Sequence, residues 1–270
     1  MEYTDIAAEL YPRTKGSVPR GVKLFTASAS GINLTRVDIL REGLRRAKGS
    51  YITLELPNFA CIDDQNEAYV LAIASQLRAL LPKEGLVLVA GIGNRAVTAD
   101  ALGPVTADGI FATRMIAAQT AQTLQTPLRA VAAFVPGVQA MTGLDVAEQL
   151  KSLVRALHPA AVLCIDSLCT ADARRLGCSV QLSTAGLSPR GMQCLSQKTL
   201  GVPVLAVGVP TVMEAHVPQR DASMSGAGPL VITPKEIDAI LRRGASLLAL
   251  SINKALQPSL RVGELAFLTS

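Results

Sequence analysis

Short, almost continuous apolar runs alternate with segments of helical periodicity along the chain, and this alternation constrains the fold more than any other feature. Apolar runs of this kind are typical of strands that are buried on both faces. The alternation predicts an α/β fold with a mostly parallel sheet and helices on both faces. Strands are expected at residues 50–56, 86–91, 129–136, 160–166, 178–183 and 202–210, and helices at 63–81, 107–124, 144–158 and 234–256.

Two further patterns complete the expected organisation. Residues 22–40 read as two strands around a Ser/Gly-rich turn, which predicts an N-terminal β-hairpin. The last helix has a marked start, with Thr233 as N-cap, Pro234 at the first helical position and Glu236 three residues after the cap. The most linker-like stretch is 216–230.

The composition agrees with one large domain. Of the 270 residues, 49% are hydrophobic, which is enough for a sizeable core. The net charge of +5 comes from scattered Lys and Arg, which indicates a solvated surface and no direct nucleic-acid partner. No apolar run reaches the roughly 18 residues of a membrane span, and the N-terminus lacks the pattern of a signal peptide. Five cysteines without a C-x-x-C pair are expected to be free thiols in the cytoplasm.

Unusual loops follow three of the expected strands. The run "LVLVAG" leads to Asp100, the run "AAFVP" leads to Gly137, and the run "AAVLCI" ends at Asp166. The right-handed crossover rule brings the carboxyl ends of parallel strands to one edge of the sheet, where ligands bind in such folds. We therefore expect Asp100 and Asp166 to face each other across a crevice.

Two carboxyl groups in one partly apolar cleft cannot both ionise freely, so one can act as a base and the other as an acid. Such a pair can activate a water molecule and protonate a leaving amide nitrogen. Each residue also has a structural interpretation. Asp100 could cap the helix that follows it, and Asp166 could be a buried, paired acid. Thr142, in "TGLD", is a candidate substrate contact, but its sequence context favours an N-cap.

Other chemistries fit the sequence less well. The stretch "GIGNRA" has the glycine spacing of a dinucleotide-binding turn, but no acid follows about 20 residues later. The two histidines, His158 and His216, stand without a G-x-S-x-G elbow, and no His/Cys/Glu cluster has the spacing of metal ligands. His158 follows a helix and is expected to be structural. The expected site therefore has no metal and no cofactor.

Several stretches of the sequence resemble those of a known protein family. The chain resembles the germination protease of spore-forming bacteria in stretches that run in the family's order from Thr4 to the last helix. These stretches are "YTDIAAE", "GSYITLELP", "GIGNRAVTADALGP", "VPGVQAMTG", "IDSL", "TLGVPVLAVGVPTV" and "VITPKEID".

The resemblance implies an atypical aspartic endopeptidase that degrades small acid-soluble spore proteins in the spore cytoplasm during germination. It implies a zymogen and a homotetramer, with Asp100 and Asp166 as the catalytic pair. It also implies a sheet like that of the hydrogenase maturation peptidases. That relationship keeps a metal-assisted peptidase with another precursor substrate as an alternative, and a peptide-binding relative without activity as a second one.

The resemblance also bears on the loops around the pair. Gly91, Gly93, Asn94, Pro136 and Gly137 are expected to shape the cleft without reacting, since glycine permits positive φ and close backbone approach.

Three departures from the family pattern indicate either an altered substrate choice or a divergent paralogue with weak activity. Ser183-Thr184-Ala185-Gly186 and a shorter loop replace an Asp-Thr-Gly and a glycine-rich loop. Ala171 replaces an arginine, and the region of residues 216–230 is shortened.

The N-terminal stretch "TDIAAE" has the order of residues at which the family's substrates are cut: an acid, an apolar residue, alanine, any residue, and a second acid. Local sequence alone favours a short helix here. The resemblance instead predicts self-processing between Asp5 and Ile6, at a mobile and accessible terminus. Residues 1–5 would then be a short propeptide, and residues 6–270 a single α/β peptidase domain.

Overall fold

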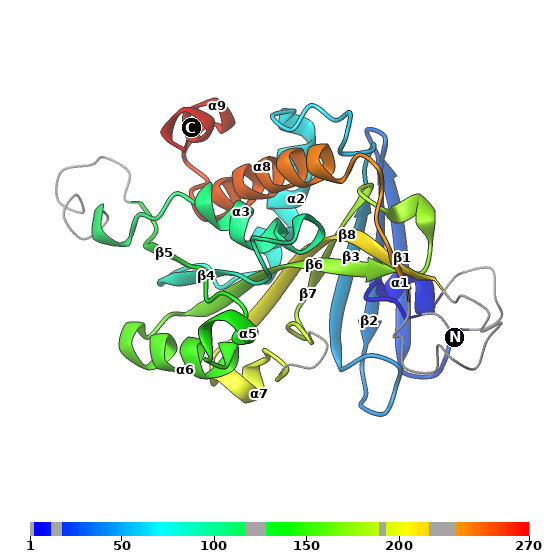
Figure 1. Cartoon of the computed structure of the whole chain (residues 1–270), viewed down its shortest axis with the longest axis horizontal. Helices are drawn as coiled ribbons and strands as arrows, with labels where there is room; N and C mark the ends of the chain where they lie inside the picture. Colours follow the sequence, from blue (N-terminus) through cyan, green and yellow to red (C-terminus); the bar gives the residue numbers. More distant parts are fainter. Residues whose placement is uncertain (1–2, 12–17, 117–127, 189–192, 216–229, 270) are drawn as a thin grey trace.

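The computed structural model describes residues 3–11, 18–116, 128–188, 193–215 and 230–269. Their strands form one mixed sheet in the order β1-β2-β3-β7-β8-β6-β4-β5, with β9 paired to β8 (Figure 1). The strands are β1 (Val22–Ala29), β2 (Ile32–Ile39), β3 (Gly49–Glu55), β4 (Val87–Gly91), β5 (Val131–Phe134), β6 (Ala161–Thr170), β7 (Ser179–Ser183), β8 (Val204–Ala215) and β9 (Leu230–Ile232).

The sheet has a parallel half and an antiparallel half. The neighbours β5, β4, β6 and β8 run parallel, as the alternation of strands and helices predicts. The predicted hairpin β1–β2 is also present, and it is joined through β3 and β7 to β8 by antiparallel pairing. The description "mostly parallel" therefore fits the half that carries the candidate site, while the sheet as a whole is mixed.

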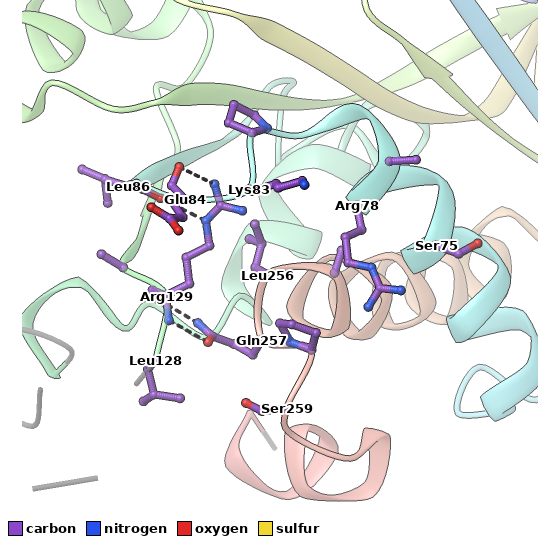
Figure 2. Close-up of a pocket in the computed structure, with 16 residues that line it drawn as sticks. Ser75, Arg78, Lys83, Glu84, Leu86, Leu128, Arg129, Leu256, Gln257 and Ser259 are labelled. Atoms are coloured by element: carbon purple, nitrogen blue, oxygen red, sulfur yellow. Dashed lines mark hydrogen bonds between the residues drawn. The ribbon is translucent and has the colours of Figure 1, made fainter. Parts of the chain in front are cut away.

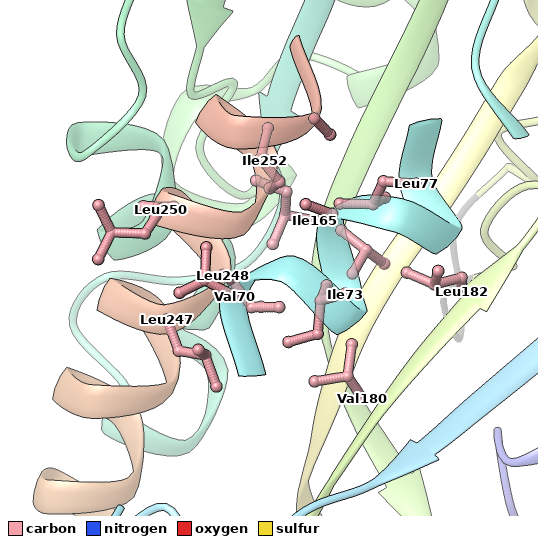
Figure 3. Packing of buried hydrophobic residues seen from close by; sticks show 14 of the residues in the cluster. Val70, Ile73, Leu77, Ile165, Val180, Leu182, Leu247, Leu248, Leu250 and Ile252 are labelled. Atoms are coloured by element: carbon pink, nitrogen blue, oxygen red, sulfur yellow. The ribbon is translucent and has the colours of Figure 1, made fainter. Parts of the chain in front are cut away.

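Helices cover both faces of the sheet, as expected (Figure 1). One face packs against α2 (Glu67–Leu80), α3 (Leu102–Asp108) and α8 (Ile237–Leu256), and Figure 3 shows the resulting core around Ile73, Ile165 and Leu248. The other face carries α6 (Val146–Leu157) and α7 (Gln197–Leu200). The remaining short elements are α1 (Ala7–Leu10), η1 (Thr98–Asp100), α5 (Gln139–Thr142), η2 (Ala173–Arg175) and α9 (Val262–Leu268).

The helix expected at residues 107–124 is wrong over residues 109–113, which are not helical, whereas residues 114–116 are helical. The structure instead has α3 at Leu102–Asp108, followed by an irregular stretch up to Thr113. The side chain of Asn253, on α8, accepts from Phe111 N at 2.9 Å and donates to Gly109 O at 2.8 Å. These hydrogen bonds satisfy the backbone of this stretch without a helix. Residues 117–127 lie outside the described part of the chain.

The predicted start of the last helix is also wrong. α8 begins at Ile237 with Glu236 at the N-cap position, and the Thr233 hydroxyl donates to Thr211 O at 2.9 Å instead of capping the helix. His158 follows α6 as its C-cap residue, which is the position expected from the sequence. All five cysteines are free. Most of the linker-like stretch, including His216, lies outside the described residues.

Candidate active site

Asp100 lies in the loop after β4, as the last residue of η1. Its Oδ2 accepts a hydrogen bond from the backbone N–H of Asn94 at 2.7 Å. The N-cap position of α3 belongs to Ala101, and no side chain caps that helix. The capping interpretation of Asp100 is therefore wrong, and its carboxylate remains available to a ligand. Burial raises the pKa of Asp100, and the hydrogen bond from Asn94 lowers it in part.

Asp166 lies within β6, which continues beyond it to Thr170. The residue is only 8% exposed, and its Oδ1 accepts from the backbone N–H of Ser167 at 2.9 Å. Burial raises the pKa of Asp166 well above the ordinary value, and the nearby charges of Asp100 and Asp5 raise it further. Among the described residues, no cation is a cause of this shift, and the backbone N–H of Ser167 donates to the carboxyl group.

One cavity of about 320 Å³ brings the two aspartates together at the carboxyl end of the parallel strands. Its walls come from the loops after β4 and β5, from β6, and from the loop after β7. The lining residues are Tyr3, Asp5, Ile92, Gly93, Asp100, Gly137, Val138, Asp166, Ser167, Leu168, Cys169, Leu187, Ser188, Val212, Glu214 and Val231. The crevice expected from the sequence is therefore present.

Burial raises the pKa of both acids, but the two carboxyl groups differ in burial and in hydrogen bonding. Asp166 is the more deeply buried, so its proton is held more firmly. Asp100 is less buried and has a hydrogen bond that favours its ionised form. This arrangement suits a pair that shares one proton, with Asp100 as base and Asp166 as acid.

Only some of the residues that were expected to shape the cleft line the cavity. Gly93 and Gly137 line the cavity, and both have positive φ, +123° and +72°. Gly91 does not line it and packs under Gly103 of α3. Asn94 acts through its backbone N–H, and Pro136 is buried just outside the lining.

Thr142 is neither a cavity residue nor a helix cap. It ends α5, and its exposed hydroxyl donates to Val138 O and accepts from Leu144 N, both at 3.2 Å. Asp145 is the N-cap of α6 instead, since its side chain accepts from Glu148 N at 3.0 Å.

Sequence reasoning missed a further acid of the cavity. Glu214, on β8, is buried and lines the cavity with the two aspartates. The strand-end argument that singles out Asp100 and Asp166 also applies to β8, but the strand was expected to end at residue 210 and in fact continues to Ala215. The longer strand is what carries Glu214 into the cavity.

The N-terminal segment also reaches this cavity, through Tyr3 and Asp5. The Asp5 carboxylate accepts from Cys169 N at 2.9 Å and lies 3.1 Å from the Arg46 guanidinium. The Asp5 backbone N–H donates to Cys169 O at 2.8 Å. Ile6 is fully buried, so the expectation of an accessible terminus is wrong.

The second acid of "TDIAAE" is held as firmly as the first. The Glu9 carboxylate lies 3.3 Å from Arg175 Nε, and it accepts from the Ala171 backbone N–H at 2.9 Å and from the Thr170 hydroxyl. Residue 171 is one of the departures from the family pattern, and here it contributes a backbone donor. The structure thus brings the stretch "TDIAAE" to the cavity of the two aspartates through Asp5.

A larger cavity of about 1040 Å³ lies at the opposite, amino ends of β4 and β5 (Figure 2). Its most buried cation, Arg129, donates to the backbone carbonyls of Gly85 at 3.0 Å and Glu84 at 3.2 Å. Ligands of parallel sheets bind at the carboxyl ends of the strands. We therefore place the candidate site in the smaller cavity, where the perturbed carboxyl groups lie.

The described residues also bear on metal sites and on membrane spans. They contain no group of three or more His, Cys, Asp or Glu side chains placed to hold a metal ion. None of their helices combines the length and the apolar character needed to cross a membrane.

Comparison with known proteins gives a consistent result. The family model described as germination protease matches residues 2–225. Germination proteases of Clostridium acetobutylicum and Caldanaerobacter subterraneus subsp. tengcongensis are 31% and 35% identical to the chain, over 97% of it, and the matches cover 97% and 96% of those proteins. Among solved structures, a [NiFe] hydrogenase maturation protease, HycI from Thermococcus kodakarensis, is 15% identical with a TM-score of 0.35, covering 66% of this chain and 98% of that one.

Proposed function

The chain belongs to the germination protease family, peptidases of spore germination, and from that premise we propose that it hydrolyses small acid-soluble spore proteins with Asp100 and Asp166 as an aspartic catalytic pair. The observation that carries the proposal is the shared cavity, in which a buried Asp166 with a raised pKa lies beside a less buried Asp100. The substrate class comes from the family resemblance.

The proposed reaction needs only one shared proton. Ionised Asp100 takes a proton from a water molecule while the water oxygen attacks the carbonyl carbon of the substrate amide. Protonated Asp166 then donates its proton to the amide nitrogen, and the C–N bond breaks. The pair ends with Asp100 protonated and Asp166 ionised, so one proton must return to Asp166 before the next cycle.

Self-processing between Asp5 and Ile6 is part of the proposal, with residues 1–5 as propeptide and residues 6–270 as the peptidase domain. The docking of both acids, Asp5 at Arg46 and Glu9 at Arg175, supports it. Because Tyr3 and Asp5 line the cavity, the propeptide would also restrict access to the aspartates. Inhibition in the zymogen would follow directly from this position.

The homotetramer and the location in the spore cytoplasm are further parts of the proposal, and they rest on the family resemblance alone. Molecular mass in solution, measured by light scattering, tests the tetramer. A mass of one or two chains under conditions of full activity would contradict it.

The function itself is tested by incubating the purified chain with a small acid-soluble spore protein, with and without a chelator. We expect cleavage after an acidic residue at a rate that the chelator does not change. Cleavage that the chelator abolishes, or cleavage of other precursors only, would favour the metal-assisted peptidase. Binding without cleavage would favour the peptide-binding relative.

A further inference from the structure

A buried glutamine on β7 holds the backbone on both sides of the Asp5–Ile6 bond. Gln181 Nε2 donates to the carbonyl oxygen of Asp5 at 2.7 Å, and Gln181 Oε1 accepts from the N–H of Ala7 at 2.8 Å. The residue is only 6% exposed. Both contacts go to main-chain atoms, so they depend on the path of the peptide and not on its side chains.

The sheet places Gln181 on the same face as Asp166. Gly208 of β8 pairs with Asp166 on one side and with Gln181 on the other, so the three residues form a row across neighbouring strands. Directly paired residues direct their side chains to the same face of a sheet. Gly208 contributes no side chain to this row, and the Leu168 side chain of β6 lies over Gly208.

Asp5 connects the two ends of this row. It lines the cavity of Asp100 and Asp166, and its charge contributes to the raised pKa of Asp166. It also lines the adjoining hollow beside Gln181 and Gly208. The carbonyl that Gln181 holds therefore belongs to the residue that reaches the aspartates.

We propose that Gln181 is a catalytic residue of self-processing, which polarises the Asp5 carbonyl and holds the Asp5–Ile6 bond for attack. When water adds to this carbonyl, negative charge develops on its oxygen, and the hydrogen bond from Nε2 strengthens at that moment. A donor of this kind contributes roughly 10²–10³-fold to the rate. The inference rests on the proposed self-processing, and it adds a residue that the aspartate pair does not supply.

The test compares Gln181→Met with the wild-type chain by following the appearance of the N-terminus at Ile6 by intact mass. We expect self-cleavage to slow by about 10²–10³-fold. Gln181→Glu is the second variant, since it keeps the size and the acceptor for Ala7 N–H but, when ionised, lacks the donor to Asp5. Ser179→Ala is the matched control, because Ser179 is buried on the same face of β7 two residues away, and it should process at the wild-type rate.

A purely structural anchor would give a different result. Hydrogen exchange of the Asp5 amide, which donates to Cys169 O, reports whether the segment stays docked. The inference requires slow cleavage with this exchange changed by less than about tenfold. A rate of self-cleavage that falls only in proportion to the loss of hydrogen-exchange protection at the Asp5 amide would overturn the inference. Wild-type rates of self-cleavage in both Gln181 variants would also overturn it. A wild-type chain that cuts added spore protein but never itself overturns this inference together with the self-processing on which it rests, and leaves the proposed hydrolysis of spore proteins standing. Inactivity on both substrates contradicts the proposed function.

Discussion

At Asp166, the carboxyl group that the proposed reaction uses is also one whose ionised form lowers the stability of the folded chain. Its pKa is raised well above the ordinary value by burial and by the charges of Asp100 and Asp5, so the folded chain favours its protonated form. In the unfolded chain the same carboxyl group ionises near its ordinary pKa of 3.8. The stability that comes from the protonated form is fully present below that pH and is lost as the pH rises through the folded pKa.

We therefore predict that the free energy of unfolding of the wild-type chain falls by up to about 1.4 kcal/mol per pH unit between these two pKa values, relative to Asp166→Asn. Denaturant unfolding of both proteins at a series of pH values from 3.5 upward measures the difference. A difference that stays constant with pH, or grows in favour of the wild type, would show that Asp166 is not held protonated.

Gly93 is expected to hold the loop that positions Asp100, and the addition of a single Cβ tests this role. A Cβ at this position would collide with the backbone carbonyl oxygen of Asp100, and φ is +123°. We expect Gly93→Ala to displace Asp100, abolish cleavage and lose more than the roughly 1–3 kcal/mol that an unfavourable φ alone costs. Gly201→Ala is the control, because Gly201 has φ +80° but nothing within 4 Å of the added Cβ.

The comparison is made by thermal unfolding and by substrate cleavage in parallel. The control should lose some stability and keep its activity. Full activity in Gly93→Ala would mean that the loop does not have to hold Asp100 where the structure has it.

At the scale of single elements, α6 gives a clean test of a helix cap. Asp145 caps α6 with a hydrogen bond to Glu148 N at 3.0 Å, whereas Thr142 makes only exposed contacts within its own turn. Asp145→Ala should cost about 1 kcal/mol of stability, and Thr142→Ala less. Chemical denaturation measures both, and neither change should alter the rate of cleavage. Equal losses in the two variants would reject the assignment of the cap.

Elements with a strong periodic pattern were predictable from the sequence, and elements fixed by distant side chains were not. The strand β4 and the first half of β6, up to Ile165, are apolar throughout, and their burial follows from that pattern alone. The stretch from Gly109 to Thr113 has helical periodicity, but Asn253, more than a hundred residues away, satisfies its backbone in another conformation. The same limit explains Thr233, whose hydroxyl bonds to a strand and not to the helix it precedes.

The residues of the candidate site also divide into those that the sequence predicts and those that only the tertiary structure brings to the site. Asp100 and Asp166 could be found from the sequence, because strand ends of a parallel sheet meet at one edge. Gln181 and Arg46 could not, because the antiparallel pairing of β7 with β8 and the docking of the N-terminal segment bring them to the site. Neither Gln181 nor Arg46 lies in a local sequence pattern that distinguishes it from other strand or loop residues.

At the scale of the whole molecule, the site depends on contacts between the two halves of the sheet. The parallel half supplies both aspartates, and the antiparallel half supplies the strand that holds the N-terminal segment. Ile6 packs into the apolar cluster of one face and Ala7 into the cluster beside the hairpin, so the segment bridges the two halves. Cutting the Asp5–Ile6 bond would leave this bridge in place while freeing the cavity of Tyr3 and Asp5.

The central claim is that Asp100 and Asp166 together carry the hydrolysis. It is tested most directly by the rate at which Asp100→Asn and Asp166→Asn cleave a small acid-soluble spore protein, measured beside the wild-type chain with thermal unfolding as the check on folding. An amide can neither take up nor hand on the proton, so we predict that each variant folds and loses at least about 10²–10⁴-fold in rate. Near-wild-type cleavage by either folded variant would contradict the account.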